Sequence, residues 1–535
     1  MFGLGVALAL AGCGPSKPDR PACPAGQVCL QFGNGAEPMT LDPHKSTGTW
    51  EAKILMDVFM GLTQDDAQGR PIPGMATSWE TSADGLTWRF HLRDAAWSDG
   101  VPVTAQDFVF SFRRILDPKT ASEFASMLYG FKNAQAINQG RMPATALGAR
   151  ALGPRELEIQ LEHPAPYLPE LLKHQVLYPV PEHVVRRWGE AWSQPARMVS
   201  NGAYTIKLWR LGDRITAVKN PRYYAADSVC VDQINYYPSS DAITGERRVR
   251  RGELDVNADI QSNRIAYLRK VAPEIVRTHT YLGLSYLAFN YDTPALRDIR
   301  VRQALSMAVD RDFITAKLLR GGQTPAYSFV PPGVANYASP PPPPWAAWPF
   351  ERRHAEARRL LAQAGYGPGH PLRIEIKHRN TPDPMLIMPA IQADWRSIGV
   401  ETTLQQNEVQ IAYAAYRAHD FQVADAAWIA DYNDPMTFLY LLQSTTGSQN
   451  YGDYRNPRYD ALIDTAERQA TSVTRARYLA RAEALMLSDA AVTPLFYYVS
   501  KNLVSPNVTG WADNIIDHHP TRYLCLGPEN QPPGG

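Results

Sequence analysis

Two kinds of hydrophobic pattern follow one another irregularly along the chain. Apolar and polar residues alternate at 86–92 and 156–161, which predicts strands with one buried face. Apolar residues recur with helical spacing at 300–319 and 351–364, which predicts helices with one buried side. Because strands and helices mix without regular alternation, the pattern predicts an α/β protein with mixed sheets.

Turn and cap signals add further elements. They predict strands at 28–32 and 201–206 and a helix at 46–62. Thr104 and Asp107 have the spacing of a helix cap, so a helix is expected to begin after Thr104. The proline run at 340–344 can only be extended, and we expect it to form an exposed surface loop.

Composition and charge narrow the class of protein. The chain has 535 residues, of which 44% are hydrophobic and 20% charged, as is typical of a globular protein with a large core. This length corresponds to roughly two to four domains. The net charge of +1 gives no broad electrostatic case for binding nucleic acid or an anionic membrane surface.

The N-terminal segment carries the signal of an exported lipoprotein. A short apolar run ends at Gly12 and Cys13, and a polar, proline-rich stretch follows. We expect residues 1–12 to be a signal peptide, Cys13 to be lipidated and residues 13–28 to be a tether. An ordinary signal peptide or a fortuitous cysteine are the alternatives. Residues 1–4 lack the expected basic residue, so the true start codon is open.

The cysteines fit an oxidising compartment. If Cys13 carries lipid, four of the five cysteines remain, and four cysteines allow three pairings. We favour a local Cys23–Cys29 bridge and a long-range Cys230–Cys525 bridge. A metal site is the alternative, but no His or Cys pair near them has zinc-like spacing, so no metal is expected.

Several segments of the chain form an ordered set of motifs: 37–45, 73–79, 86–92, 97–108, 201–204, 298–305 with Asp310 and Arg311, and 428–435. Taken in this order, they resemble the oligopeptide-binding proteins of bacterial ABC importers, in extracellular solute-binding protein family 5 (the peptide- and nickel-binding class). The resemblance covers almost everything after residue 36.

The resemblance implies a two-lobed periplasmic-binding-protein fold of the class with an extra domain, with a hinge between the lobes. Lobe I is then assembled from three stretches. The implied boundaries are 29–59, 184–282 and 498–535 for lobe I, 60–183 for the extra domain II, and 283–497 for lobe III.

The family's ligand-facing loop matches residues around Asp431. By itself, this Asp beside Asn433 would be interpreted as a turn former. The resemblance implies that Asp431 binds a ligand ammonium, that Trp428 and Tyr432 lie close by, and that residues 427–429 offer backbone groups for strand addition. Further positions near ligand in the family are Phe124, Thr47 and Thr49. The candidate ligand residues are thus Asp431, Trp428, Ala427, Ile429, Tyr432, Asn433, Phe124, Thr47, Thr49 and Arg417.

The chain departs from the family pattern at the other end of the ligand. Some relatives hold the ligand carboxylate with an arginine three residues before the tryptophan, where this chain has Asp425. A histidine serving longer peptides is replaced near Met385, and neither Arg417 nor Arg320 aligns cleanly with a basic position. A cysteine pair near the cleft is also absent, with Gly283 and Ile429 in its place. The alternatives are a different peptide length, a ligand carboxylate held through water, or a ligand without a normal C-terminus.

The resemblance implies a lipid-anchored, periplasmic or cell-surface substrate-binding component that delivers short peptides to an ABC permease and ATPase. We expect a monomer that is not an enzyme and needs no cofactor. No hydrolase or phosphate-binding motif occurs, and the pair His518 and His519 is expected to be solvated. The alternatives are a cell-wall-derived peptide, a non-peptide ligand such as haem, a metal chelate or an opine, and a tethered sensor or chaperone.

Overall fold

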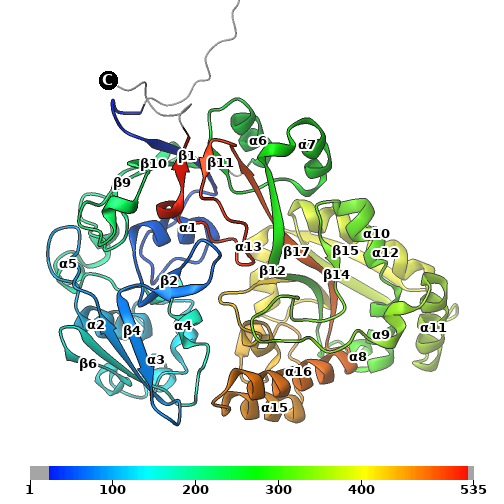
Figure 1. The fold of residues 1–535 in the computed structure, drawn as a ribbon. Coiled ribbons are helices and arrows are strands. Elements are labelled where there is room, and N and C mark those ends of the chain that lie inside the picture. The colour runs from blue at the N-terminus through cyan, green and yellow to red at the C-terminus, as the bar shows by residue number, and fades with distance from the viewer. Residues whose placement is uncertain (1–22, 240, 528–535) are drawn as a thin grey trace, which may run out of the picture.

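A computed structural model describes residues 23–239 and 241–527 (Figure 1). The predicted signal peptide, Cys13 and the first part of the tether lie outside the described residues. The N-terminal half of the chain and the C-terminal half form two bodies, and the last residues return to the first body. Within the described ranges, no helix combines the length and apolarity needed to cross a membrane.

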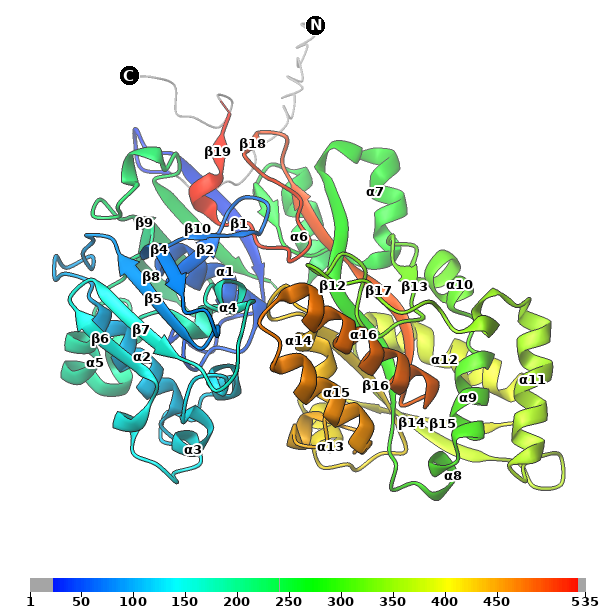
Figure 2. The ribbon, with the colours of Figure 1, turned by 60° about the horizontal axis from the view of Figure 1, so that its bottom comes forward.

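One large sheet runs through both bodies. Its strands lie in the order β15-β14-β16-β12-β17-β11-β1-β10-β9-β8. At its centre, the long antiparallel strands β12 (Val276–Phe289) and β17 (Val492–Val504) pass from one body into the other (Figure 2). Their register shifts between Thr280 and Leu284. Such an irregularity bends a strand pair, and here it lies where the pair passes between the two bodies.

The first body contains the N-terminal strand and its neighbours. Parallel pairing joins β1 to β10 and β11, and antiparallel pairing joins β10, β9 and β8. Its elements are β1 (Cys29–Gly35), α1 (Thr49–Val58), α5 (Glu182–Trp188), β8 (Tyr204–Arg210), β9 (Arg214–Lys219), β10 (Gln233–Pro238), α6 (Ala242–Arg250), β11 (Val256–Asn257), α7 (Ile265–Val271), β18 (Val508–Thr509) and β19 (Cys525–Leu526).

A second, four-stranded sheet covered by α2 lies beside this part. Its strands are ordered β4-β5-β7-β6, and α2 packs against β6 and β7. The elements here are β2 (Thr63–Asp65), β3 (Pro71–Pro73), β4 (Ala76–Thr81), β5 (Thr87–Leu92), α2 (Ala105–Leu116), α3 (Ala134–Asn138), β6 (Ala149–Gly153), β7 (Glu156–Gln160) and α4 (Leu168–Leu171). One continuous core serves this sheet and the first body.

A buried ion pair joins α2 to the opening segment of the chain. The Arg114 guanidinium donates to both oxygens of Asp42, at 3.0 and 2.5 Å. The Asp42 carboxylate also accepts a hydrogen bond from the Trp192 indole N–H. The His44 ring nitrogen Nδ1 lies 2.8 Å from Nη1 of Arg114. The segment that resembles the family's opening motif therefore fixes α2 against the first body.

The second body places helices on both faces of the large sheet. The helices α9, α11 and α12 pack on one face, and α13 to α16 pack on the other. Its elements are α8 (Pro294–Arg297), α9 (Ile299–Ala308), α10 (Arg311–Phe313), β13 (Thr324–Pro325), α11 (Phe350–Gln363), β14 (Arg373–Arg379), α12 (Pro382–Ser397), β15 (Glu401–Asn407), α13 (Val409–Arg417), β16 (Val423–Ile429), α14 (Met436–Leu439), α15 (Pro457–Glu467) and α16 (Ser472–Ser488).

The strand and cap predictions agree with the structure, but the helix at 300–319 was predicted too simply. It breaks after Ala308, and Asp310 caps a new start by accepting the backbone N–H of Phe313. The chain then continues as α10 and a π-helical segment, Ile314–Leu319. The helix predicted at 46–62 is shorter and spans Thr49–Val58.

The two C-terminal histidines are not solvated as predicted. The His518 ring nitrogen Nδ1 lies 2.8 Å from the buried carboxylate of Asp65. The His519 ring stacks on Trp511, with ring centroids 3.7 Å apart, and only 5% of its side chain is exposed. The C-terminal segment is thus packed against the first body because its polar residues find buried partners there.

Both favoured disulfides are formed in the structure. Cys23 is bonded to Cys29, and Cys230 is bonded to Cys525 across 295 residues. The long-range bridge ties β19 to the chain just before β10.

Removing the long-range bridge should lower stability without changing the ligand site. Cys230→Ser with Cys525→Ser is expected to lower the free energy of unfolding by about 2–4 kcal/mol. The bridge closes a long loop in the unfolded chain, and without it the unfolded chain gains conformational entropy. Denaturant unfolding measures this. The matched control, Cys23→Ser with Cys29→Ser, opens a loop of only six residues and should lose less. Equal losses in the two variants would contradict the loop argument.

Candidate ligand-binding site

The segment between β16 and α14 is held rigidly on one side. Asn433 accepts a hydrogen bond from the backbone N–H of Ala335 at 2.9 Å. The Asp434 carboxylate receives two bonds from the buried Arg475, at 2.8 and 2.6 Å. Asp434 also accepts the N–H of Met436, the first residue of α14 (Met436–Leu439). Asn433 and Asp434 therefore connect this segment to residues outside the turn.

Tyr432 reaches from this loop to the opposite body. Its ring stacks on Tyr167, which follows the four-stranded sheet, with centroids 5.6 Å apart and planes 12° apart. The guanidinium of Arg475, a residue of α16, lies 4.4 Å from the Tyr167 ring centroid. The Tyr167 hydroxyl donates to Glu467 at 3.3 Å. We call Tyr167, Tyr432, Arg475 and Glu467 the bridging cluster, because it joins the two bodies beside Asp431.

Asp431 is a carboxylate without a basic partner. Its backbone N–H donates to the Thr437 hydroxyl at 3.1 Å, and that hydroxyl donates to the carboxylate at 3.4 Å. Across the described ranges, no Lys, Arg or His lies within ion-pair distance of it. Burial raises the pKa of Asp431 to about 7, and the Thr437 hydroxyl only partly opposes this. Such a group is poised to receive a cation.

Aromatic side chains surround this carboxylate. Tyr281 and Tyr440 both lie close enough for the Asp431 charge to raise the pKa of their hydroxyls further, after burial. Trp428 packs edge-on against Tyr440, with centroids 5.9 Å apart. The Trp428 indole N–H is buried, and no acceptor for it lies in the part of the chain that the structure describes. Buried donors are normally paired, so this N–H is a second polar group available to a ligand.

The end of β16 offers an open backbone edge. On one side, residues 423–429 pair fully with β12. On the other side, β14 pairs only with Val423 and Ala424, and then diverges. Within the described residues, Ala427, Trp428 and Ile429 have no strand on that side. Alternate backbone groups of this stretch therefore face away from β12, where an extended ligand can add as a strand.

An ion pair between Arg379 and Asp425 joins β14 and β16 where the two strands diverge. The sequence did not reveal this pair. Arg379 donates through Nε and Nη2 to both oxygens of Asp425, at 2.8 and 3.1 Å. Its Nη1 donates to the Tyr413 hydroxyl at 3.0 Å. Asp425 is fully buried, and the Arg379 side chain is 10% exposed. Asp425 stands where some relatives have an arginine, and in this chain it pairs with Arg379 of β14.

The other basic candidates lie away from this pair. Arg417 is exposed on the last turn of α13, and Arg320 is exposed after the π-helical segment. Met385, which stands near the family's histidine position, lies on α12 with 48% of its surface exposed. Gly283 and Ile429 are direct strand partners, and a Cβ at Gly283 would lie 2.5 Å from the Ile429 side chain. The two residues therefore form a matched small-and-large pair.

The candidate ligand residues from the first body do not contact Asp431 through hydrogen bonds or ring contacts among the described residues. Thr47 and Thr49 are exposed at the start of α1, and Phe124 is half-buried against the His174 ring. Among the described residues, they make no hydrogen bond or ring contact with 427–433. Tyr167, Arg379 and Arg475 were missed because their contacts join segments far apart in the sequence. Thr437 was missed although it lies only six residues from Asp431. Arg379, at the end of an alternating strand, had a local signal.

The arrangement suits a cationic, extended ligand. It combines a half-buried carboxylate, an indole N–H without an acceptor in the described residues, and an open strand edge. A search of the described ranges finds no group of three or more His, Cys, Asp or Glu side chains that could hold a metal ion.

Comparisons with known proteins identify the family. The family model described as bacterial extracellular solute-binding proteins, family 5 Middle, matches residues 70–450. The periplasmic oligopeptide-binding protein OppA of Salmonella typhimurium is 38% identical over 492 residues, which cover 91% of this chain and 90% of that protein. The probable deoxycholate-binding periplasmic protein YgiS of Escherichia coli is 36% identical over 504 residues, 94% of this chain and 93% of that one.

A solved structure extends the likeness to the whole fold. The structure of OppA from Burkholderia pseudomallei has a TM-score of 0.85 and 35% sequence identity, and the match covers 94% of this chain and 99% of that one. The two-lobed periplasmic-binding-protein fold expected from the sequence is therefore confirmed, and the chain is a binding protein and not an enzyme. This chain belongs to family 5 of the bacterial extracellular solute-binding proteins.

Proposed function

We propose that this protein is the substrate-binding component of a peptide ABC importer, and that it binds short peptides through their N-terminal ammonium at Asp431. The observation that carries the proposal is the half-buried Asp431 carboxylate, which has no basic partner in the described chain and stands at the end of the open β16 edge. The likeness to OppA supports peptides as the ligand class.

The geometry suggests the direction and length of the peptide. With its ammonium at Asp431, a peptide on the β16 edge runs antiparallel to β16, toward Asp425. Since a strand rises about 3.3 Å per residue, the stretch from Ile429 back to Asp425 suits roughly three to five peptide residues. Its C-terminus then meets Arg379, whose charge Asp425 already balances. We expect a weak hold on the ligand carboxylate.

Calorimetry with one tripeptide in three forms tests this proposal. The unmodified peptide should bind best. N-acetylation removes the ammonium and should weaken binding by at least about tenfold. C-amidation should change affinity by much less. Mass spectrometry of molecules that co-purify with the protein separates the peptide proposal from a non-peptide ligand. If acetylation had no effect, the proposed role of Asp431 would fall.

Peptide affinity should depend on pH in a defined direction. Burial holds the pKa of free Asp431 at about 7, and an ammonium partner would lower it, so binding requires the proton to leave. Affinity should therefore rise from pH 5 to about 7, with nearly one proton released per peptide near pH 6. It should fall above about 8, where the peptide amine loses its own proton. Calorimetry in buffers of different ionisation enthalpy measures the release. Affinity that is constant from pH 5 to 7 would contradict this.

Closure of the cleft would be stabilised by the bridging cluster. Tyr167 contributes a stacking contact, a cation–π contact and a hydrogen bond across the two bodies. Tyr167→Leu is expected to speed peptide release about tenfold, since aromatic and cation–π contacts each contribute roughly 0.5–1.5 kcal/mol. Stopped-flow fluorescence measures the rate. The matched control is Tyr366→Leu, which removes a stacked tyrosine away from the interface. Equal rates in both variants would exclude the bridge.

Anchoring and assembly complete the proposal. Lipidation of Cys13 would hold the protein at the membrane, where it delivers peptide to a permease driven by a separate ATPase. The boundaries given above place residues 29–59, 184–282 and 498–535 in lobe I. We propose that the hinge lies where β12 and β17 cross between the lobes. Cys13→Ala should move the protein from the membrane fraction to the soluble fraction.

A further inference from the structure

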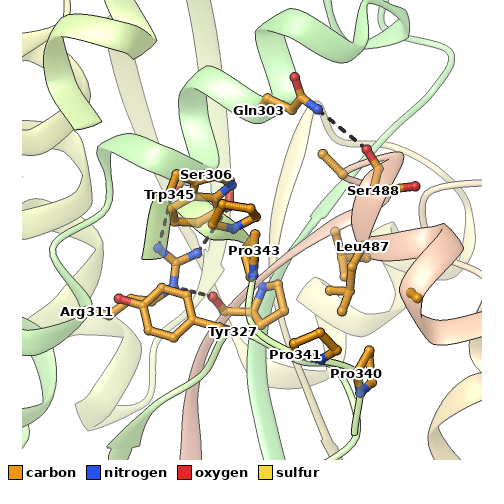
Figure 3. Close-up of a pocket in the computed structure, with 15 residues that line it drawn as sticks. Gln303, Ser306, Arg311, Tyr327, Pro340, Pro341, Pro343, Trp345, Leu487 and Ser488 are labelled. Carbon is orange, nitrogen blue, oxygen red and sulfur yellow. Dashed lines mark hydrogen bonds between the residues drawn. The ribbon is translucent and has the colours of Figure 1, made fainter. Parts of the chain in front are cut away.

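A cavity lies in the second body, away from the 427–433 segment. It has a volume of about 340 Å³ and lies between α9, α16 and the proline run at 340–344 (Figure 3). The proline run is therefore not merely an exposed loop, because its rings form one wall. The volume falls within the range of small-molecule sites, about 300–1,000 Å³. Neither Asp431 nor Trp428 lines this cavity.

The cavity contains a buried guanidinium whose partners are all neutral. Arg311 is 1% exposed. Its Nε donates to the carbonyl oxygens of Ala326 and Pro494, at 3.0 and 2.8 Å. Its Nη1 donates to the Ser306 carbonyl at 2.9 Å, and its Nη2 donates to the Ser306 hydroxyl at 3.2 Å. One N–H of Nη2 has no acceptor within residues 23–239 and 241–527.

Among the described residues, no carboxylate forms an ion pair with this guanidinium, and the Asp312 charge acts on it only from a greater distance. Within the same ranges, no Asp or Glu lies within ion-pair distance of Arg311. A second buried arginine, Arg353, adds to the positive field, and burial together with Arg353 lowers the pKa of Arg311 to about 10. Buried charges are normally paired because an isolated charge is costly in a poorly polar site. The site therefore favours an anion.

The walls define the rest of the ligand. The Arg311 guanidinium contacts both the Tyr327 and the Trp345 ring, 5.0 and 5.5 Å from their centroids, and the two rings also pack edge-on against each other (Figure 3). Prolines have no backbone N–H, so their wall offers flat apolar surface without donors. Leu487 adds an aliphatic side, and Gln303 provides a polar group at the α9 side. One cation in an apolar, aromatic-lined cavity matches a carboxylate on a rigid apolar body.

We propose that this cavity is a second binding site, which takes a small aromatic or alicyclic carboxylic acid. The carboxylate accepts from the remaining Nη2 hydrogen of Arg311, and the apolar body lies against Trp345 and the proline run. Binding here is independent of peptide in the cleft.

Calorimetry with naphthoate and with its neutral amide tests the proposal. Naphthoate should bind about tenfold more tightly than naphthamide, as a charge-assisted hydrogen bond would give. Arg311 itself is left in place, because its removal would strand several buried carbonyls. Gln303 offers a matched pair instead: Gln303→Glu should weaken naphthoate binding, and Gln303→Lys should strengthen it, with little change for naphthamide.

Two further variants establish the location. Ala484→Trp places an indole in the cavity from an exposed position on α16, and it should abolish naphthoate binding while peptide binding persists. Asp431→Asn should leave naphthoate binding unchanged. Equal affinity for acid and amide would overturn the proposal. So would displacement of naphthoate by peptide, or naphthoate binding that survives Ala484→Trp in a protein that still binds peptide.

Discussion

Asp431→Asn is expected to weaken binding of an unmodified tripeptide by roughly 30-fold or more. Truncating one partner of a buried charge pair costs about 2–5 kcal/mol, and each 1.4 kcal/mol is about a factor of ten. The substitution keeps the shape of the side chain and the acceptor for Thr437, so folding should be retained. Calorimetry gives the affinity, and the thermal midpoint checks the fold.

A double cycle makes this prediction specific for the ammonium. The wild-type protein should prefer the unmodified peptide strongly over its N-acetylated form, whereas Asp431→Asn should bind the two forms almost equally. The matched control is Asp460→Asn, which changes an acidic residue of α15 that bonds only to Ser444 in the described chain. It should leave the preference intact. A variant that keeps the wild-type preference without Asp431 would contradict the assignment.

Asp425→Ala is expected to destabilise the ligand-free protein by about 3–5 kcal/mol. The change leaves the Arg379 guanidinium buried without its carboxylate, and breaking a buried pair on one side has this cost. The double variant Asp425→Leu with Arg379→Met replaces both charges by apolar groups and should recover most of the loss. Scanning calorimetry of the ligand-free forms measures both.

The same two variants distinguish structure from ligand binding. If the pair is mainly structural and its charges cancel, the double variant should bind C-amidated peptides as well as the wild type does. If Asp425→Ala were no less stable than the wild type, the pair would not be the buried contact described here.

Local features of the fold could be predicted because their causes lie within a few residues. Thr104 and Asp107 form the capping box that begins α2, and the alternating residues 156–160 form β7. The break after Ala308 was missed although Asp310 is a good cap, because the apolar spacing continues through it. Apolar periodicity alone does not show where one helix ends and the next begins when both helices bury the same side of the segment.

The sequence predicted two residues of the site but not the partners that surround them. Asp431 and Trp428 came from a resemblance, since an Asp near Asp-Pro is normally a turn residue. The partners that define their chemistry lie far away in sequence: Tyr167 stacks on Tyr432 across 265 residues, and Arg379 meets Asp425 across a strand junction. His518 was misjudged for the same reason, because Asp65, its partner, is 453 positions distant.

A crystal structure with a bound tripeptide tests the central claim most directly. We expect the peptide ammonium within hydrogen-bond distance of the Asp431 carboxylate, and the peptide backbone paired along 427–429 of β16. A peptide lying elsewhere, or an Asp431 side chain turned to bulk solvent in that complex, would contradict it.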